Sequence, residues 1–188
     1  MQGAPPLPDP GARRSLRARL AAGPVARAVA HVDLRVFRFV RGTLHHRETA
    51  ERVASFSRLG EHAACWLALG ATGYAVDPAR RDGWRRATGA VVTAYLVNTG
   101  LKAVLRRQRP ALEDLPALIA TPTKLSFPSA HSSSSFAAAR AFGTLVPART
   151  LYAVAVPMAA SRVYLGVHYP SDIAVGAVLG TTAASVLR

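Results

Sequence analysis

Five apolar segments follow one another between residues 62 and 187, and no other feature constrains the fold as strongly. They cover residues 62–76, 87–105, 130–147, 149–165 and 172–187. A helix that crosses a bilayer needs about 20 residues, and about 17 can suffice, so each segment is long enough only with its flanks. Helices buried in a soluble protein are therefore the alternative. Short basic or Pro- and Gly-containing connections, and the many Gly and Ala residues that let helices pack closely, favour a membrane bundle.

The positive charge of the chain is distributed in blocks. The 188 residues suit a single domain, and their formal net charge is +14. Arg residues are dense before residue 60 and cluster near residues 80–86 and 102–109, with long stretches of little charge between them. Basic loops between apolar segments are typical of a membrane protein, whereas a nucleic-acid-binding protein presents a basic face. We therefore expect the membrane, and no nucleic acid, as a partner.

Three regions follow one another along the chain. Residues 1–24 are rich in Pro, Gly and Arg, which predicts a disordered basic N-terminus. Residues 25–58 are predicted to hold an amphipathic interfacial helix, over residues 25–45, and a linker; an ordinary helix packed on the protein is the alternative. Residues 59–188 would form the membrane domain. The predicted fold is all-α, an integral membrane bundle of about five transmembrane helices plus an N-terminal amphipathic helix.

The basic residues also predict an orientation. The Arg-rich region before residue 59 should stay in the cytoplasm, and five crossings then place the connections 102–128 and 161–171 on that side. The Arg residues at 80–86 fall on the opposite side and count against this orientation, and every loop would be inverted if residues 25–45 crossed the membrane. We expect a multi-pass protein of the cell membrane whose two connections face the cytoplasm.

Two stretches at the ends of apolar segments carry cations or a titratable group. In KAVLRRQRP, Lys102 and Arg109 are seven residues apart, so a helix continuing that far would place both on one face. In FPSAHSSSS, Pro128 and Ser129 are typical of a helix start, where exposed N–H groups bind anions, and His131 lies in the first turn. Alone, the first stretch is more typical of a membrane-surface anchor and the second of a structural histidine, with the serines lining a polar helix face.

The third stretch, SRVYLGVHYPSD, contains Arg162, His168 and Asp172. A carboxylate at the start of the last segment can accept a hydrogen bond from one ring nitrogen of His168, which fixes the tautomer and leaves the other nitrogen free to attack. Ionisable groups at membrane depth are costly and indicate function.

Together the three stretches indicate phosphoryl transfer. Three cations and a helix N-terminus at one side of a membrane suit a phosphate dianion, and the reaction needs neutralised oxygens, a nucleophile in line and an acid for the leaving group. The sequence has no Cys/His or multi-carboxylate cluster with metal-ligand spacing, so we expect neither a metal nor another cofactor.

These stretches make the chain resemble the type 2 phosphatidate phosphatase superfamily, whose soluble relatives include vanadium haloperoxidases and acid phosphatases. Its signature motifs are Lys-x6-Arg-Pro, Pro-Ser-Gly-His and Ser-Arg-x5-His-x3-Asp, which match Lys102–Pro110, Pro128–His131 and Ser161–Asp172. The resemblance covers residues 60–187. Ala130 stands where the family usually has Gly, and its N–H can still serve unless the position needs a positive φ.

The resemblance implies a metal-independent lipid phosphatase and a role for each residue. His168 would form a phosphohistidine, Asp172 would orient it, and His131 would protonate the departing oxygen and then activate water. The phosphate would be held by Lys102, Arg109, Ser129, Ala130 and Arg162. The residues alone leave open which histidine attacks, and the resemblance chooses His168.

The substrate is expected to be a lipid phosphate monoester. The stretch SRLGEHAACWLALG, residues 57–70, is similar to the start of short actinobacterial-type members, which remove the 5-phosphate of decaprenylphosphoryl-5-phosphoribose on the path to cell-wall arabinose donors. Glu61 and His62 would then contact a sugar, or else cap the first membrane helix. Alternative substrates are an undecaprenyl-type or other polyprenyl diphosphate and phosphatidate. A membrane lipid-binding scaffold is the non-enzymatic alternative, which the intact motif residues oppose, and a soluble haloperoxidase would be much larger and less apolar.

Overall fold

The computed structural model describes residues 23–43 and 46–187 and is helical through most of them. The helices are α2 (Pro24–Thr43), α3 (Arg47–Arg58), η1 (Glu61–Ala63), α4 (Ala64–Val76), η2 (Pro78–Arg80), α5 (Arg81–Leu105), α6 (Ala130–Phe142), α7 (Ala148–Tyr164) and α8 (Pro170–Val186). Residues 106–129 form a long loop between α5 and α6, and the only strand-like pairings within the described ranges are two isolated β-bridges in this loop. The predicted all-α class is therefore confirmed. The disorder predicted for residues 1–24 falls, up to residue 22, outside the described residues.

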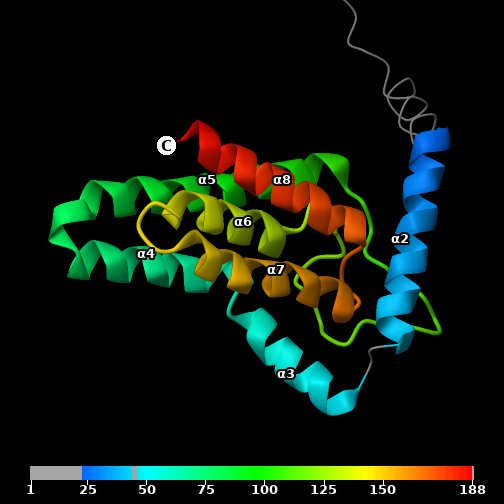
Figure 1. Ribbon diagram of the computed structural model, residues 1–188. Helices are drawn as coiled ribbons and strands as arrows, with labels where there is room; N and C mark the ends of the chain where they lie inside the picture. Colours follow the sequence, from blue (N-terminus) through cyan, green and yellow to red (C-terminus); the bar gives the residue numbers. More distant parts are fainter. Residues whose placement is uncertain (1–22, 44–45, 188) are drawn as a thin grey trace, which may run out of the picture.

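Helices α4–α8 run side by side as a bundle, with α6 packed among α5, α7 and α8 (Figure 1). Small residues let these helices approach closely, as their Gly and Ala content predicts. A Cβ atom added at Gly176 of α8 would lie 2.7 Å from the carbonyl oxygen of Ser129, and one at Gly180 would overlap the carbonyl oxygen of Ser133. The α6–α8 contact therefore depends on residues without side chains.

The serine run at the start of α6 does not form the polar face that its composition suggested. Residues 132–135 are all buried between helices. Ser132 donates to the carbonyl oxygen of Ile173 at 2.7 Å, and the indole N–H of Trp66 donates to Ser135 Oγ at 2.9 Å. Hydroxyl groups can donate to carbonyl oxygens of their own or a neighbouring helix, so these serines stay hydrogen-bonded although they are buried away from water.

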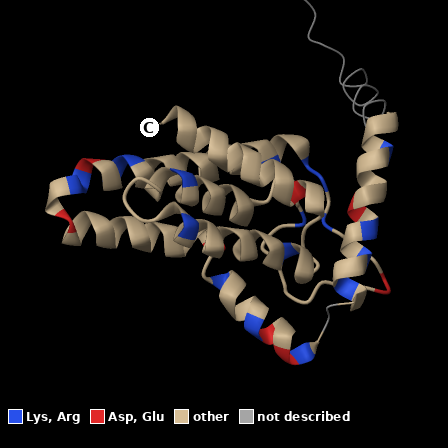
Figure 2. Ribbon diagram, in the orientation of Figure 1, with Lys and Arg blue, Asp and Glu red and all other residues tan. Residues whose placement is uncertain are grey.

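The ends of the bundle differ in what they carry. The C-termini of α5 and α7 and the N-termini of α6 and α8 meet at one end, as the connectivity predicts, and the α4–α5 and α6–α7 turns lie at the other (Figure 1). Charged residues concentrate at these two ends and on α2 and α3, whereas few lie along the middle of the helices (Figure 2). Such a banded distribution is expected of helices that lie in a bilayer.

The number of membrane crossings stays a prediction. Within the described part of the chain, one helix, Pro78–Leu105, is long and apolar enough to cross a membrane by length and composition. Helices α4 and α6 have 13 residues each and α7 and α8 have 17 each. These lengths are at or below the minimum for a bilayer, which is the shortfall already visible in the sequence.

Helix α2 lies across the end of the bundle where the four helix termini meet (Figure 1). Its buried residues are Asp33, Phe37 and Arg41. Much of its remaining surface is apolar and exposed, including Val25, Val29, Val32, Val36 and Phe39. An interfacial location of this helix stays a prediction, and these exposed side chains motivate it.

The segment expected to be a linker after α2 is largely helical. Residues Arg47–Arg58 form α3. One side of this helix faces the bundle, and residues on that side, among them Val53 and Ser57, are partly or fully buried. The stretch is mostly polar, but its apolar residues Ala50, Val53 and Ala54 recur at helical spacing and are partly buried, so the expectation of a linker was wrong.

Candidate active site

A cavity of about 180 Å³ opens at the bundle end where the four helix termini meet. Six of the eight predicted site residues line it: Lys102, Arg109, Ala130, His131, Arg162 and His168. The other two stand behind this lining, since Ser129 precedes α6 and Asp172 lies in the first turn of α8, both fully buried. The three stretches of sequence, far apart along the chain, thus meet at one place.

His168 is held by a partner at each ring nitrogen. Its Nδ1 lies 3.3 Å from Asp172 Oδ2, and its Nε2 lies 3.1 Å from Arg109 Nη1. A guanidinium can only donate, so Nε2 must accept and Nδ1 must carry the proton that points to the carboxylate. Both contacts select the same neutral tautomer. The nitrogen with the available lone pair is therefore Nε2, the atom beside the cations.

The surroundings of His168 favour its neutral form. Burial lowers the pKa of His168 well below its usual range, and the nearby positive charges of Arg109, Lys102 and Arg162 lower it further. A hydrogen bond with the backbone of Ser126 acts in the opposite direction and is a smaller effect. At neutral pH the imidazole is thus unprotonated, which is the form that can act as a nucleophile.

His131 is oriented from the end of α3. Its Nε2 lies 3.1 Å from the carbonyl oxygen of Ser57, which can only accept, so Nε2 carries a proton and Nδ1 is the nitrogen that can exchange one. The approach is close at Gly60, where an added Cβ would lie 2.8 Å from Cδ2 of His131 and 2.6 Å from Sδ of Met158. A residue without a side chain is therefore needed beside this ring.

The three cations reach the cavity from different elements. Arg162 is 4% exposed, donates to Ser57 Oγ at 2.6 Å, and has a buried Nε without a partner among the described residues. Arg109 is fixed by the carbonyl oxygens of Val167 at 2.7 Å and Thr123 at 2.8 Å. Lys102 Nζ lies 3.5 Å from the carbonyl oxygen of Leu125. A buried guanidinium with an unused N–H is a ready anion ligand.

Lys102 and Arg109 do not share a helix face, contrary to one expectation. Helix α5 ends at Leu105, and Arg106 follows it with a left-handed φ of 53° and donates its N–H to the carbonyl oxygen of Lys102. The chain then runs beside residues 124–126, where the N–H of Arg109 donates to the carbonyl oxygen of Lys124 at 3.0 Å. Arg109 therefore reaches the cavity from a loop.

A helix begins where the sequence predicts one, at the start of α6. Ser129 is its N-cap, and its hydroxyl accepts the N–H of Ser132 at 3.4 Å. Ala130 is the first helical residue and is not among the described non-Gly residues with positive φ, which are His62, Ala63 and Arg106. Alanine therefore fits where the signature has Gly, and its N–H lies at the helix N-terminus beside His131.

Sequence reasoning missed three residues that support the site. Arg107 donates to Asp172 Oδ1 at 2.9 Å, and Asp33 pairs with Arg107 at 2.7 Å. Ser57 contacts both Arg162 and His131. Asp33 left a signal, because it is the only acidic residue in an otherwise basic helix. Arg107 was one of several basic residues taken as a surface cluster, and Ser57 left none.

Polar groups also line the side of the cavity formed by η1 and α5. They are Glu61, His62, Tyr95, Asn98 and Thr99. His62 Nδ1 lies 2.8 Å from the hydroxyl of Tyr95, and both amide atoms of the fully buried Asn98 lack partners among the described residues. No side-chain hydrogen bond caps α4, so the structure does not show Glu61 or His62 in the capping role considered above.

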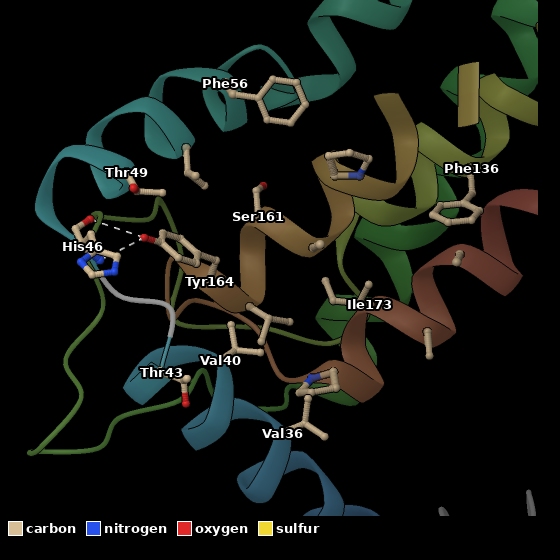
Figure 3. Close-up of a pocket in the computed structure, with 17 residues that line it drawn as sticks. Val36, Val40, Thr43, His46, Thr49, Phe56, Phe136, Ser161, Tyr164 and Ile173 are labelled. Carbon is tan, nitrogen blue, oxygen red and sulfur yellow. Dashed lines mark hydrogen bonds between the residues drawn. The ribbon is translucent and has the colours of Figure 1, made fainter. Parts of the chain in front are cut away.

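A larger apolar groove of about 890 Å³ borders the site without containing it. Figure 3 shows it between α2, α3, α7 and α8, with Val40, Phe56, Tyr164 and Ile173 around it. Its lining includes none of the predicted site residues, although Ser161 and Ile173 are the chain neighbours of Arg162 and Asp172. Its walls offer apolar contact rather than chemistry.

The cavity has the donors for an anion and lacks a set of metal ligands. Within the described part of the chain, no group of three or more His, Cys, Asp or Glu side chains is placed to hold a metal ion. The arrangement can bind a tetrahedral anion between three cations, attack it with His168 Nε2, and exchange a proton through His131.

Comparison with known families and proteins gives consistent results. The PAP2 superfamily model matches residues 84–188. The chain is 44% identical over 124 residues to the decaprenylphosphoryl-5-phosphoribose phosphatase of Mycolicibacterium smegmatis, covering 65% of this chain and 68% of that one. It is 40% identical over 131 residues to the Mycobacterium tuberculosis protein of the same name, covering 70% and 74%.

Two solved structures share the fold. One is Aquifex aeolicus LpxE, with a TM-score of 0.70, 24% identity, and coverage of 81% of this chain and 92% of that chain. The other is a transmembrane PAP2-type phosphatidylglycerolphosphate phosphatase from Bacillus subtilis, with a TM-score of 0.71, 21% identity, and coverage of 94% and 91%. At these identities the likeness extends to the fold alone.

Proposed function

This chain belongs to the PAP2 superfamily, and from that premise we propose that it removes the 5-phosphate of decaprenylphosphoryl-5-phosphoribose through a phosphohistidine on His168. The family and the relatives make it a lipid phosphate phosphatase, a phosphoric monoester hydrolase. The observation that carries the catalytic proposal is the meeting of three cations and two histidines in one cavity. The roles of the individual residues are part of the proposal.

In the first step, Nε2 of His168 attacks phosphorus, and the bond from phosphorus to the ester oxygen breaks. His131, which takes up a proton on Nδ1 once the phosphate dianion is bound beside it, gives that proton to the departing oxygen, so the lipid leaves as an alcohol. Arg109, now beside Nε2, would turn its N–H groups to the phosphoryl oxygens, together with Lys102, Arg162 and the N–H groups at the start of α6. These donors neutralise the charge on the equatorial oxygens.

In the second step, neutral His131 accepts a proton from water as that water attacks the phosphohistidine. The nitrogen–phosphorus bond breaks, phosphate leaves, and His168 regains its lone pair. Asp172 keeps the proton of His168 on Nδ1 and stabilises the positive charge that the ring carries while phosphorylated. The step consumes one water and returns both histidines to their starting states.

Two features of the cavity support a sugar between the phosphate and the lipid. The side formed by His62, Tyr95, Asn98 and Thr99 carries hydroxyl, imidazole and amide groups, which suit the hydroxyls of a pentose. Ser161, the chain neighbour of Arg162, lines the apolar groove of Figure 3. An apolar groove next to the cavity supports a substrate with a long hydrocarbon chain. A cytoplasmic site, which the basic residues predict, suits a phosphorylated sugar lipid.

The test is a substrate panel with the protein purified in detergent. We expect release of phosphate from decaprenylphosphoryl-5-phosphoribose with kcat/KM at least about tenfold above that for phosphatidate or polyprenyl diphosphate, because only the first offers hydroxyls to the polar side of the cavity. His168→Ala should release no phosphate from any of them. EDTA should leave the rate nearly unchanged. Preference for polyprenyl diphosphate would overturn the substrate, and turnover by His168→Ala would overturn the mechanism.

A further inference from the structure

Helix α2 is attached to the bundle through one stripe of buried residues, Asp33, Phe37 and Arg41, at helical spacing. Each of them reaches a loop at the active-site end. Phe37 packs on the ring of Tyr169, with ring centroids 6.0 Å apart, and Arg41 donates to the carbonyl oxygen of Pro116 at 2.6 Å. Asp33, which is 2% exposed, makes the most specific contacts of the three.

Asp33 binds the start of α8 directly. Its Oδ1 accepts the N–H of Ser171 at 2.8 Å, and its Oδ2 accepts the Ser171 hydroxyl at 2.6 Å. The same Oδ2 accepts Arg107 Nη2 at 2.7 Å. A carboxylate that is this buried needs such partners, because an unpaired charge away from water is very costly.

Arg107 links Asp33 to Asp172. Its Nη1 donates to Asp172 Oδ1 at 2.9 Å and to Ser171 Oγ at 2.6 Å. Its guanidinium also lies over the ring of Tyr169, 4.3 Å from the centroid. The other oxygen of Asp172 accepts the N–H of Tyr169 at 2.8 Å and faces His168. Both oxygens are therefore fixed, and the carboxylate has one orientation toward the imidazole.

We propose that Asp33 and Arg107 are positioning residues that act through Asp172 on His168, which makes α2 part of the catalytic apparatus. This inference rests on the proposed role of His168 as the nucleophile. The order Asp33, Arg107, Asp172, His168 alternates negative, positive and negative groups before the ring. Loss of Asp33 leaves Arg107 free to turn, and Asp172 then no longer holds the ring in line with phosphorus.

Asp33→Asn and Arg107→Gln should each lower kcat by about 10–100-fold, the usual cost of losing a partner behind a reacting group. KM and the inhibition constant of inorganic phosphate should change less than about threefold, because Lys102, Arg109 and Arg162 stay in place and carry the phosphate binding. Arg107→Lys, which keeps the charge but cannot bind two carboxylates at once, should retain an intermediate kcat.

A double variant separates positioning from general support of the fold. Asp33→Asn combined with Arg107→Gln should lose clearly less kcat than the product of the two single losses, since the ion pair through which Asp33 reaches the carboxylate of Asp172 is already broken in either single variant. Asp114→Asn is the matched control, because it removes another ion pair of α2, with Arg38 at 2.9 Å, that is exposed and has no route to Asp172. This control should keep the wild-type kcat.

Three results would overturn the inference: a wild-type kcat in both single variants, multiplicative losses in the double variant, or loss of phosphate inhibition in step with kcat. If Asp33→Asn does not accumulate as folded protein, Arg107→Lys supports the same test, with reduced kcat and unchanged phosphate inhibition expected. A failure of the proposed function is distinguishable, because His168→Ala would then retain turnover or the wild type would not hydrolyse the lipid.

Discussion

At the scale of single residues, the proposed mechanism depends on keeping His168 neutral among three cations. Its lowered pKa arises first from burial and then from Arg109, Lys102 and Arg162. Lowering the pH adds a proton to Nε2 and removes the nucleophile, so activity falls only when the pH passes through this lowered pKa. We expect kcat/KM to hold at pH 6.5, the ordinary pKa of a histidine, and to fall at lower pH.

Arg109→Gln should move that fall to higher pH, besides lowering the rate. The substitution removes a positive charge that lowers the pKa of His168. It also removes the N–H group of Arg109 whose hydrogen bond Nε2 can accept only while His168 is neutral. Measuring both proteins with the same substrate cancels the titration of the substrate phosphate itself, whose second pKa is about 6. An acid limb at the same pH in both proteins would show that Arg109 does not control the protonation of His168.

The three stretches, together with the family resemblance that they carry, predicted eight site residues, and the structure gathers all eight at the cavity or directly behind it. Asp33, Arg107 and Ser57 could not be placed in the same way. Asp33 is 138 positions from Ser171, which it binds, and Ser57 is 105 from Arg162. Their importance comes from tertiary contacts between distant segments, for which a single sequence holds no periodic or spacing signal.

At the scale of elements, the five apolar segments predicted the helices α4–α8, but a continuation of α5 as far as Arg109 was wrong. The helix ends at Leu105 because the next residue, Arg106, has a left-handed backbone conformation. Arg rarely adopts this conformation, so the residue type did not predict it. The helical character of α3 was missed although its few apolar residues recur at helical spacing, because the stretch is mostly polar. The backbone of Arg106, in contrast, departs from local preference.

The α6–α8 contact leads to a prediction about stability. Gly180→Ala should lower the free energy of unfolding by about 1–3 kcal/mol, because the new methyl group overlaps a backbone oxygen that cannot move aside. Gly89→Ala is the matched control on α5, where an added Cβ meets nothing within 4 Å, and it should stabilise by about 0.4–1 kcal/mol. Thermal unfolding in detergent measures both, and equal shifts would refute the role of close packing.

At the scale of the whole molecule, the position of α2 predicts that the candidate site lies near one face of the membrane. This helix crosses the bundle end that holds the cavity, and its exposed valines suit the boundary between lipid and water (Figure 1). Helices α2 and α3 bring seven arginines to this end: Arg27, Arg35, Arg38, Arg41, Arg47, Arg52 and Arg58. The opposite end has its own cluster of arginines at residues 80–86. Because basic residues favour the cytoplasmic side, the two clusters favour opposite orientations of the protein.

We expect the end with the cavity to face the cytoplasm, because its arginines outnumber those of the opposite turn and the N-terminal region usually dominates. Labelling of intact cells with a membrane-impermeant maleimide decides this in a Cys65→Ser background, which removes the only cysteine of the chain. Asp114→Cys, at an exposed position on the site side, should react only after lysis. Ala79→Cys, exposed in the turn at the far end, should react in intact cells. The reverse pattern in variants that keep phosphatase activity would place the site outside, where released carrier lipids are recycled, and would favour a polyprenyl diphosphate as substrate.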